Sequence, residues 1–424
     1  MNIAIISYHT CPLATLGGKD TGGMNVYVRE LTRFLGKNDI HADVFTRSQD
    51  DCVPHILHDL GCGNRVVHVP AGPETPLPKT ELINYLDEFT NGILSFAESK
   101  QIKYDVIHSH YWLSGLAAGK LKESWDIPVI QMFHTLALLK NKIAKSSKEL
   151  EGESRINGEK QVLQMADRVV VATIDERQHL DELYQADLKK VVTIPPGVDT
   201  TRFYPIPEDE AKEFLGIPID EKMLLFVGRI EPLKGIDTLI KAISQMKKSD
   251  VMSTCPHYLY IIGGDPNGEK IDEDSEIQRL KRLCHDLGVD DLIIFMGKKD
   301  QDTLPYYYSA AEIVVMPSNY ESFGMVALEA MACATPVVAT QVGGLQHLVQ
   351  DGITGFIVPH NDPNALEEKL TRLICQPDLC KEMASNAVQY ARSYSWDKIT
   401  PQIIDLYKET INEFNPSMSS RTRN

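Results

Sequence analysis

The sequence has little that would hold a polyanion or anchor the chain in a membrane. Its 424 residues carry 43 basic and 59 acidic side chains, a formal net charge of −16 at pH 7. This balance offers no broad positive field to nucleic acid or to an anionic lipid surface, so any bound phosphate must meet a local cluster of cations. No window approaches the roughly eighteen unbroken apolar residues of a membrane span. We therefore expect no nucleic-acid partner and no stable insertion into a membrane.

The cysteines follow no ordered pattern, and the N-terminal residues do not have the pattern of a leader segment. The eight cysteines are scattered without CxxC pairs or the histidine spacing of a zinc site. The N-terminus MNIAIISYHT lacks the basic start and long apolar run of a signal peptide. We expect a reduced, cytoplasmic protein without bound metal. Its oligomeric state is open and could be a homodimer.

What the chain does contain is a regular alternation of short β-branched runs and longer stretches with helical period. Strands are predicted at 2–7, 42–46, 66–70, 104–110, 128–134 and 167–174, with helices at 24–36, 79–100, 112–124 and 148–166. In the first helix, Met24, Val28, Leu31 and Leu35 share one apolar stripe. This alternation is typical of a parallel sheet covered by helices on both faces.

The alternation stops at VVTIPPGVDTTRFYP (191–205), whose prolines and glycine break both periods, and then starts again. Further strands are predicted at 222–229, 258–264, 291–297, 312–317, 335–340 and 355–359, with helices at 234–248, 275–287, 303–311, 324–334 and 363–376. We predict an α/β protein of two tandem, doubly wound Rossmann-like domains, 1–195 and 196–395, facing across a cleft. Residues 396–424 would form a C-terminal helix and tail that could pack back on the first domain.

A glycine-rich stretch, GGKDTGGMNVYVREL (17–31), follows the first strand and opens the first helix. The amides of Gly22, Gly23 and Met24 would then face outward at the carboxyl end of the sheet, where anions bind in such folds. The spacing matches neither the dinucleotide nor the Walker fingerprint. A plain flexible loop and an anion or sugar site both fit.

Two cations follow the first strand of the second domain, in VGRIEPLKGID (227–237). Arg229 and Lys234 could hold a diphosphate from two sides, with the planar fork of one and the movable charge of the other. A solvated basic turn is the simpler alternative. The strand-end position and the flanking glycines favour binding.

Two glutamates frame the stretch PSNYESFGMVALEA (317–330). A carboxylate can accept two hydrogen bonds from a vicinal diol, as proteins use to hold sugars. Glu321 and Glu329, eight residues apart, could therefore hold two sugars of one nucleotide sugar, with a helix N-terminus between them. Two surface acids near a helix cap would explain less well the small residues Ser322 and Gly324 beside them.

Histidines and cations of the first domain gather at predicted strand ends. A lone histidine is usually structural, but four of them, His9, His108, His110 and His134, fall at ends of the same predicted sheet. Lys79, Lys140 and Arg155 lie in or beside its helices, and each alone is most simply a solvated charge.

Taken together, these motifs resemble the family 4 retaining glycosyltransferases, which have the GT-B architecture. The resemblance covers essentially the whole chain through GGMNVYVREL, GRIEPLKG and the E-x7-E signature of Glu321 and Glu329. The blocks HTCPLATLGGKDTGGMNVY, VPAGP, HSHYWLSG, HTLALLKN and GESRINGEKQ are similar to the subgroup of inositol-phosphate glycosyltransferases and sucrose-phosphate synthases. Leu138 stands where the family block has a lysine.

The resemblance implies a site for each substrate. The donor nucleotide sugar would contact Gly23, Arg229, Lys234, Glu321, Ser322, Phe323, Gly324, Met325, Val326 and Glu329. The acceptor would contact His9, Asp20, Thr21, Gly22, Gly23, Met24, Asn25, Lys79, Tyr111, Thr135 and Arg155. The residues closest to the chemistry would be His134, Arg229, Lys234 and Glu321. Such transfer is described without a protein nucleophile, metal or cofactor, because protein cations and amides stabilise the leaving diphosphate.

The implied function is a hexosyltransferase of the EC 2.4 type. It would move glucose or N-acetylglucosamine, with retention, from a nucleotide sugar, UDP-linked by the same resemblance, to a phosphorylated polyol such as inositol 3-phosphate. Transfer to fructose 6-phosphate is the alternative, and a nucleotide-sugar epimerase is a more distant one. A two-domain solute-binding protein would need an export signal.

Overall fold

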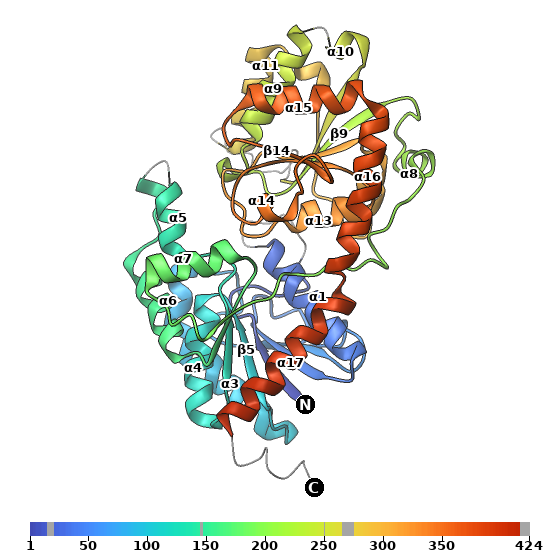
Figure 1. Ribbon diagram of the computed structural model, residues 1–424. Helices are drawn as coiled ribbons and strands as arrows, with labels where there is room; N and C mark the ends of the chain where they lie inside the picture. Colours follow the sequence, from blue (N-terminus) through green and yellow to red (C-terminus); the bar gives the residue numbers. More distant parts are fainter. Residues whose placement is uncertain (15–20, 145–146, 250, 265–274, 416–424) are drawn as a thin grey trace. The chain divides into compact units, whose positions relative to one another are not determined.

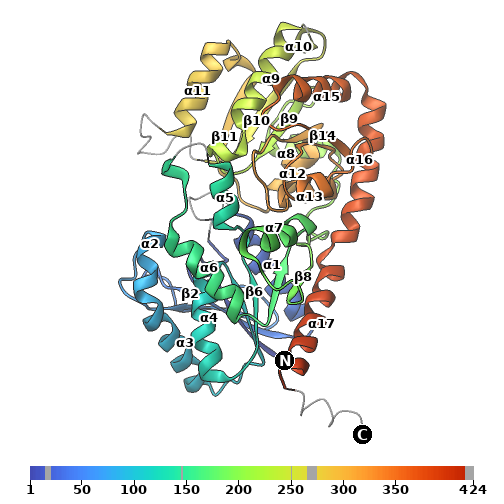
Figure 2. The same ribbon diagram turned by 60° about the vertical axis from the view of Figure 1, so that its left-hand side comes forward.

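The computed structural model describes residues 1–14, 21–144, 147–249, 251–264 and 275–415, which form two compact units (Figures 1 and 2). Unit 1 comprises Met1–Ala14, Gly23–Gly197 and Trp396–Asn424, and unit 2 comprises Thr15–Gly22 and Val198–Ser395. The C-terminal segment thus belongs to the first unit. Within the described residues, no helix combines the length and apolar character needed to cross a membrane.

Unit 1 is built on an eight-stranded sheet in which all neighbouring strands are parallel except β3 and β4. Its central strands are largely buried and rich in β-branched residues, as the core of a parallel sheet requires. In spatial order they are β3 (Ile56–Leu57), β4 (Arg65–Val69), β2 (His41–Arg47), β1 (Asn2–Ile6), β5 (Val106–His110), β6 (Val129–Met132), β7 (Arg168–Val171) and β8 (Val191–Thr193).

Helices cover both faces of this sheet. One face packs against α3 (Leu86–Lys100), α4 (Trp112–Trp125), α6 (Glu153–Met165) and α7 (Ile174–Tyr184). α1 (Gly23–Lys37) packs against β2 and lies beside α17 (Trp396–Phe414), the long red helix of Figure 1. The predicted apolar stripe of α1 is confirmed, since Val28, Leu31 and Leu35 are fully buried. The shorter helices are α2 (Lys79–Leu82) and α5 (Ala137–Ile143).

Unit 2 is built on a six-stranded, entirely parallel sheet. In spatial order its strands are β11 (Ile293–Gly297), β10 (His257–Ile262), β9 (Lys222–Val227), β12 (Ile313–Met316), β13 (Val337–Thr340) and β14 (Gly355–Val358). One face packs against α9 (Ile236–Lys248), α11 (Glu276–Leu287) and α15 (Pro363–Cys375). The remaining helices are α8 (Glu208–Leu215), α10 (Val251–Thr254), α12 (Leu304–Ala310), α13 (Met325–Ala332), α14 (Leu345–Leu348) and α16 (Pro377–Ala391).

Several predicted elements have different bounds in the structure. The helix predicted at 79–100 is broken, because Tyr85 leaves the helical region (φ −108°, ψ 12°) and α3 begins after it. The helix predicted at 148–166 begins only at Glu153, after an extended Gly152. The segment 191–205, predicted to be irregular, contains edge strand β8, and α7 was not predicted at all. Thr173 and Glu176 form the capping pair that could have located α7, since the Thr173 hydroxyl accepts from the Glu176 amide at 3.1 Å.

Candidate functional site

The sheet of unit 1 reverses its winding between β1 and β5. β2 and β4 extend it on one side of β1 and β5 to β8 on the other, so the carboxyl ends of β1 and β5 meet where ligands bind in doubly wound sheets. His9 follows β1 and Tyr111 follows β5, and their ring centroids are 4.4 Å apart. Two residues assigned to the acceptor by resemblance therefore lie together at the position that the topology favours.

The backbone at this edge is strained at two predicted site residues. Tyr111, at the start of α4, has φ 75° and ψ 158°, a conformation that is essentially restricted to glycine. His134, just beyond β6, has φ 63°. The Tyr111 amide donates to the Met132 carbonyl at 2.8 Å, and the Gln131 side chain donates to the Tyr111 carbonyl at 3.2 Å. Such strain persists where the surroundings impose it, and it concentrates at functional sites.

Cations surround the Tyr111 ring. The Lys79 ammonium lies 5.4 Å and the Arg155 guanidinium carbon 4.9 Å from the ring centroid, close enough for cation–π attraction. Lys140 on α5 joins them through Glu151, whose carboxylate pairs with both Lys140 and Arg155. α5 and α6, which carry Lys140 and Arg155, pack against each other (Figure 2). The three charges that looked independent in the sequence form one group.

Arg155 is held rigidly at the centre of this group. Its Nε donates to the Glu159 carboxylate at 2.8 Å, and its Nη2 donates to the carbonyl and hydroxyl of Thr135 at 3.0 and 2.9 Å. Glu159 is fully buried and also accepts from the Ala137 amide and the Tyr184 hydroxyl. Burial alone would lower the Arg155 pKa, but the surrounding acidic groups outweigh it and the pKa is raised. The guanidinium is thus fixed in place and permanently charged.

Histidines form a row along the same edge. His108 and His110 are fully buried in β5, and His110 Nδ1 lies 3.0 Å from His134 Nε2. His108 Nδ1 lies 2.7 Å from the hydroxyl of Tyr407, so α17 contacts this row. Burial lowers the pKa of His108 and of His134 to about 3. Burial also lowers the pKa of His9, with Lys79, His134 and Arg155 adding to the effect. These imidazoles are therefore neutral near pH 7, beside fixed positive charges.

Unit 2 has its own reversal point, between β9 and β12. The carboxyl ends of these neighbouring strands lead to Arg229 and Lys234 on one side and to Glu321 on the other. Lys234 Nζ donates to Glu321 Oε2 at 2.6 Å, and both side chains are largely buried. Arg229 is more exposed and pairs with Glu231 at 3.0 Å. The two donor motifs predicted from the sequence thus meet in an ion pair.

Glycines allow the chain segments around this pair to approach each other. Gly235, with φ 63°, ends the short 3₁₀ turn Pro232–Lys234, and a Cβ there would lie 2.0 Å from the Pro317 carbonyl oxygen. A Cβ on Gly343, with φ 44°, would lie 1.9 Å from the Glu321 carbonyl oxygen. Both distances are shorter than any real Cβ contact, so the neighbouring carbonyl oxygen leaves no room for a side chain at either position.

We expect Gly343→Ala to displace the Glu321 loop and lower kcat/KM for the donor at least tenfold, about 1.4 kcal/mol of transition-state stabilisation. Steady-state kinetics at varied donor concentration would measure this. Gly352→Ala is the matched control, because Gly352 also has a positive φ but nothing lies within 4 Å of the position that its methyl group would take. Equal kinetics in the two variants would contradict the close approach at Gly343.

Glu329 lies on α13, whose N-terminus begins after Gly324 and has no side-chain cap. The Glu329 side chain is buried, and its Oε2 accepts from the Tyr308 hydroxyl at 2.8 Å. Phe323 and Gly324 are buried in the preceding loop, whereas Ser322, Met325 and Val326 are partly exposed. The uncapped amides at the start of α13, beside the partly exposed Met325 and Val326, are the kind of group that meets an anion or a sugar hydroxyl.

The glycine-rich stretch is described from Thr21 onward, and Asp20 lies outside the described residues. Gly23 is the first residue of α1 and is exposed, as the sequence predicted for the helix start. Met24 is partly exposed. Asn25 is buried, and its amide donates to the Thr10 hydroxyl at 2.7 Å and the Cys11 carbonyl at 2.8 Å. Asn25 therefore ties α1 to the loop after β1.

Sequence reasoning missed the acidic partners of Arg155. Glu159 lies four residues after Arg155 on α6, the spacing at which charges meet on a helix, and that spacing was the available signal. Glu151 precedes α6, so helical spacing did not point to it. Nothing comparable pointed to Tyr184 and Tyr308, which reach Glu159 and Glu329 from other helices.

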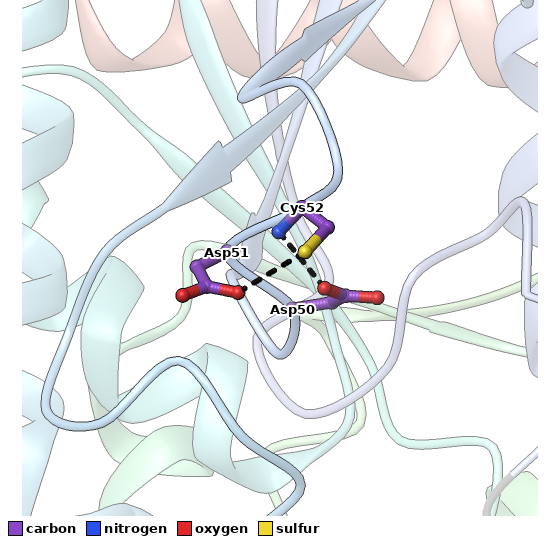
Figure 3. Close-up of side chains that lie close together, drawn as sticks. All are labelled: Asp50, Asp51 and Cys52. Carbon is purple, nitrogen blue, oxygen red and sulfur yellow. Dashed lines mark hydrogen bonds between the residues drawn. The ribbon is translucent and has the colours of Figure 1, made fainter.

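Two other features, an exposed acidic cluster and a cavity, are separate from the predicted site residues. Asp50, Asp51 and Cys52 are consecutive, exposed residues whose ligand atoms lie close together, and Figure 3 shows hydrogen bonds that close the turn within the group. A cavity of about 580 Å³ lies between α6 and α7, and none of the predicted site residues lines it. Its lining includes the polar side chains Lys160, Gln164, Asp187 and Lys190.

Comparison with known proteins assigns the chain to a family. Residues 21–202 match the family described as Glycosyltransferase Family 4, and residues 207–390 match glycosyl transferases group 1. A D-inositol 3-phosphate glycosyltransferase of Actinosynnema mirum is 40% identical over 413 residues, covering 97% of this chain and 98% of that protein. The protein of the same name from Saccharomonospora viridis is 38% identical over 413 residues, covering 97% and 95%.

A solved structure agrees with this assignment. Sucrose-phosphate synthase from Thermosynechococcus elongatus superposes with a TM-score of 0.87 at 33% identity, covering 96% of this chain and 98% of that one. The two parallel-sheet α/β units of this chain are those of the GT-B architecture predicted from the sequence. The chain therefore belongs to glycosyltransferase family 4 and is a glycosyltransferase.

Proposed function

We propose that this enzyme transfers a hexose, with retention of configuration, from a UDP-sugar to a phosphorylated polyol or sugar such as inositol 3-phosphate. The hexose would be glucose or N-acetylglucosamine. The observation that carries the acceptor proposal is the group of Lys79, Lys140 and Arg155 around Tyr111 at the reversal point of unit 1. A neutral polyol would not need three cations there, whereas a phosphate monoester would.

The donor proposal rests on unit 2. Arg229 and Lys234 would meet the diphosphate, where negative charge grows as the sugar leaves, and the amides at the start of α13 would add fixed dipoles. Glu321 would hold hydroxyls of the transferred hexose and Glu329 those of the ribose. His134, neutral near pH 7, would be a polar partner of the hexose. Because two protein cations already neutralise the diphosphate, the proposal needs neither a metal nor a cofactor.

Transfer to fructose 6-phosphate is the second candidate, favoured by the likeness to sucrose-phosphate synthase. A matrix of UDP-glucose, UDP-N-acetylglucosamine and GDP-mannose against inositol 3-phosphate and fructose 6-phosphate would distinguish the two, with released nucleotide as the readout. Unphosphorylated inositol and fructose are the matched controls. We expect release with one UDP-sugar and one phosphorylated acceptor. Equal release with the unphosphorylated partner would remove the phosphate argument, and conversion of the donor without any acceptor would favour an epimerase.

A further inference from the structure

Glu151 links two of the three cations of the group in unit 1, Lys140 and Arg155. One oxygen of its carboxylate, Oε1, contacts both Lys140 Nζ and Arg155 Nη1, the latter at 2.7 Å. The backbone of Glu151 is fixed to α5 by the Asn141 side chain. The Glu151 amide donates to Asn141 Oδ1 at 2.7 Å, and the Glu151 carbonyl accepts from Asn141 Nδ2 at 3.1 Å. A carboxylate oxygen shared by two cations stands where a phosphate oxygen would bind both.

Two of the three cations in this group, Lys140 and Arg155, are already balanced by carboxylates. Lys140 and Arg155 face the two carboxylates Glu151 and Glu159. Four of the five N–H donors of Arg155 are already bonded, to Glu151, Glu159 and Thr135. A phosphate that bound without any rearrangement would lie beside one carboxylate for each of these cations. It can form ion pairs with both cations only if one carboxylate moves away from them.

Only one of the two carboxylates is placed to leave. Glu159 is fully buried and also satisfies the Ala137 amide and the Tyr184 hydroxyl, so its removal would strand buried polar groups. The Glu151 side chain retains 23% of its exposure and can turn toward solvent. Burial acts to raise the pKa of Glu151, but Arg155 and Lys140 together outweigh it and hold the pKa below its usual value, so the group is charged at neutral pH.

We propose that Glu151 is a specificity-determining residue that holds the place of the acceptor's phosphate and is displaced by it. When Glu151 moves away, its ion pairs with Lys140 and Arg155 are lost. A phosphate dianion replaces both ion pairs, whereas a ligand with a single negative charge or none does not. Glu151 would thus select doubly charged acceptors, while Glu159 keeps Arg155 in position. This inference rests on the proposed function, because it assumes that the acceptor carries a phosphate.

Glu151→Gln tests the exchange, since the amide oxygen can still accept from Lys140 and Arg155 but the competing charge is gone. We expect inorganic phosphate, titrated calorimetrically into the full chain, to bind roughly tenfold more tightly to this variant, because it then displaces a neutral amide and not a carboxylate paired with two cations. The matched control is Glu153→Gln, which removes the same charge from an exposed position two residues away. Its affinity for phosphate should stay within about twofold of the original.

Two outcomes separate the possible errors. Weaker or unchanged phosphate binding in Glu151→Gln would show that Glu151 only orients the cations, and would overturn the inference. A double variant, Lys140→Ala with Arg155→Lys, should lose phosphate binding. If it binds phosphate as well as the original chain, the cation group is not the phosphate site and the acceptor proposal itself fails.

Discussion

Replacing Lys234 with alanine should lower the rate of sugar transfer about a hundredfold, or about 3 kcal/mol, because Lys234 is one of two cations proposed to stabilise the leaving diphosphate. Negative charge on that group is greater in the transition state than in the bound donor, so the loss should appear in kcat and not only in KM. The measurement is kcat at saturating donor and acceptor, with the substrate pair that the matrix identifies.

The structure adds a second consequence of this change. Lys234 pairs with Glu321 at 2.6 Å, and only about a sixth of either side chain is exposed. Without Lys234, the Glu321 carboxylate loses this partner, so its position and its hold on the hexose should weaken as well. Lys241→Ala is the matched control, because Lys241 lies on α9, is half exposed and pairs with Asp237 only at 3.7 Å. A folded Lys234→Ala enzyme with near-normal turnover would remove Lys234 from the chemistry.

Acid should destabilise unit 1 through its buried histidines. The pKa of His108 is lowered to about 3 by burial, with His134 adding to the effect, whereas an unfolded histidine titrates near pH 6.5. Between these values the unfolded chain binds one proton more than the folded chain. The free energy of unfolding therefore falls as the pH falls, by about 1.4 kcal/mol per pH unit and on the order of 4 kcal/mol by pH 3, for His108 alone. His110, which is also fully buried, shifts in the same direction.

Glu176 works against this trend over part of the range. Burial raises its pKa to about 7, so between about pH 4.5 and 7 the folded chain holds a proton that the unfolded chain has lost. Its contribution to stability is present at low pH and is lost as the pH rises. The pH dependence of the unmodified protein is thus a sum of opposing contributions, and a variant is needed to isolate His108.

His108→Asn removes the titrating group while an amide oxygen can still face the Tyr407 hydroxyl. We expect it to flatten the acid slope of the unfolding free energy by about 1.4 kcal/mol per pH unit between pH 6 and 4. All three tryptophans, Trp112, Trp125 and Trp396, lie in unit 1, so urea unfolding followed by tryptophan fluorescence reports on this unit. His285→Asn, an exposed position in unit 2, is the control. An unchanged slope in His108→Asn would mean that His108 is not the buried neutral group described here.

Much of the architecture could be predicted because its signals are local. Each strand of a parallel sheet is a short apolar run, each crossover helix carries a stripe, and the residue after each strand lies at the edge where ligands bind. Arg229, Glu321, His9 and Tyr111 were therefore recognisable as strand-end residues before any fold was known. Element bounds were less predictable, as the break at Tyr85 shows, because the helical period itself continues across it.

Tertiary structure alone decided which of these residues meet. The sequence of strands does not state their order in the sheet, and only the reversal between β1 and β5 brings His9 to Tyr111, more than a hundred residues away along the chain. The ion pair of Lys234 and Glu321 spans 87 residues and depends on β9 lying beside β12. The sequence by itself determined two parallel-sheet units and the polar residues at their edges, since propensity and periodicity act over a few residues. That Lys140 joins Arg155 at Glu151 was decided by packing, because Lys140 lies 11 residues before Glu151 and on a different helix from Arg155, and the periodicity of neither helix records this approach.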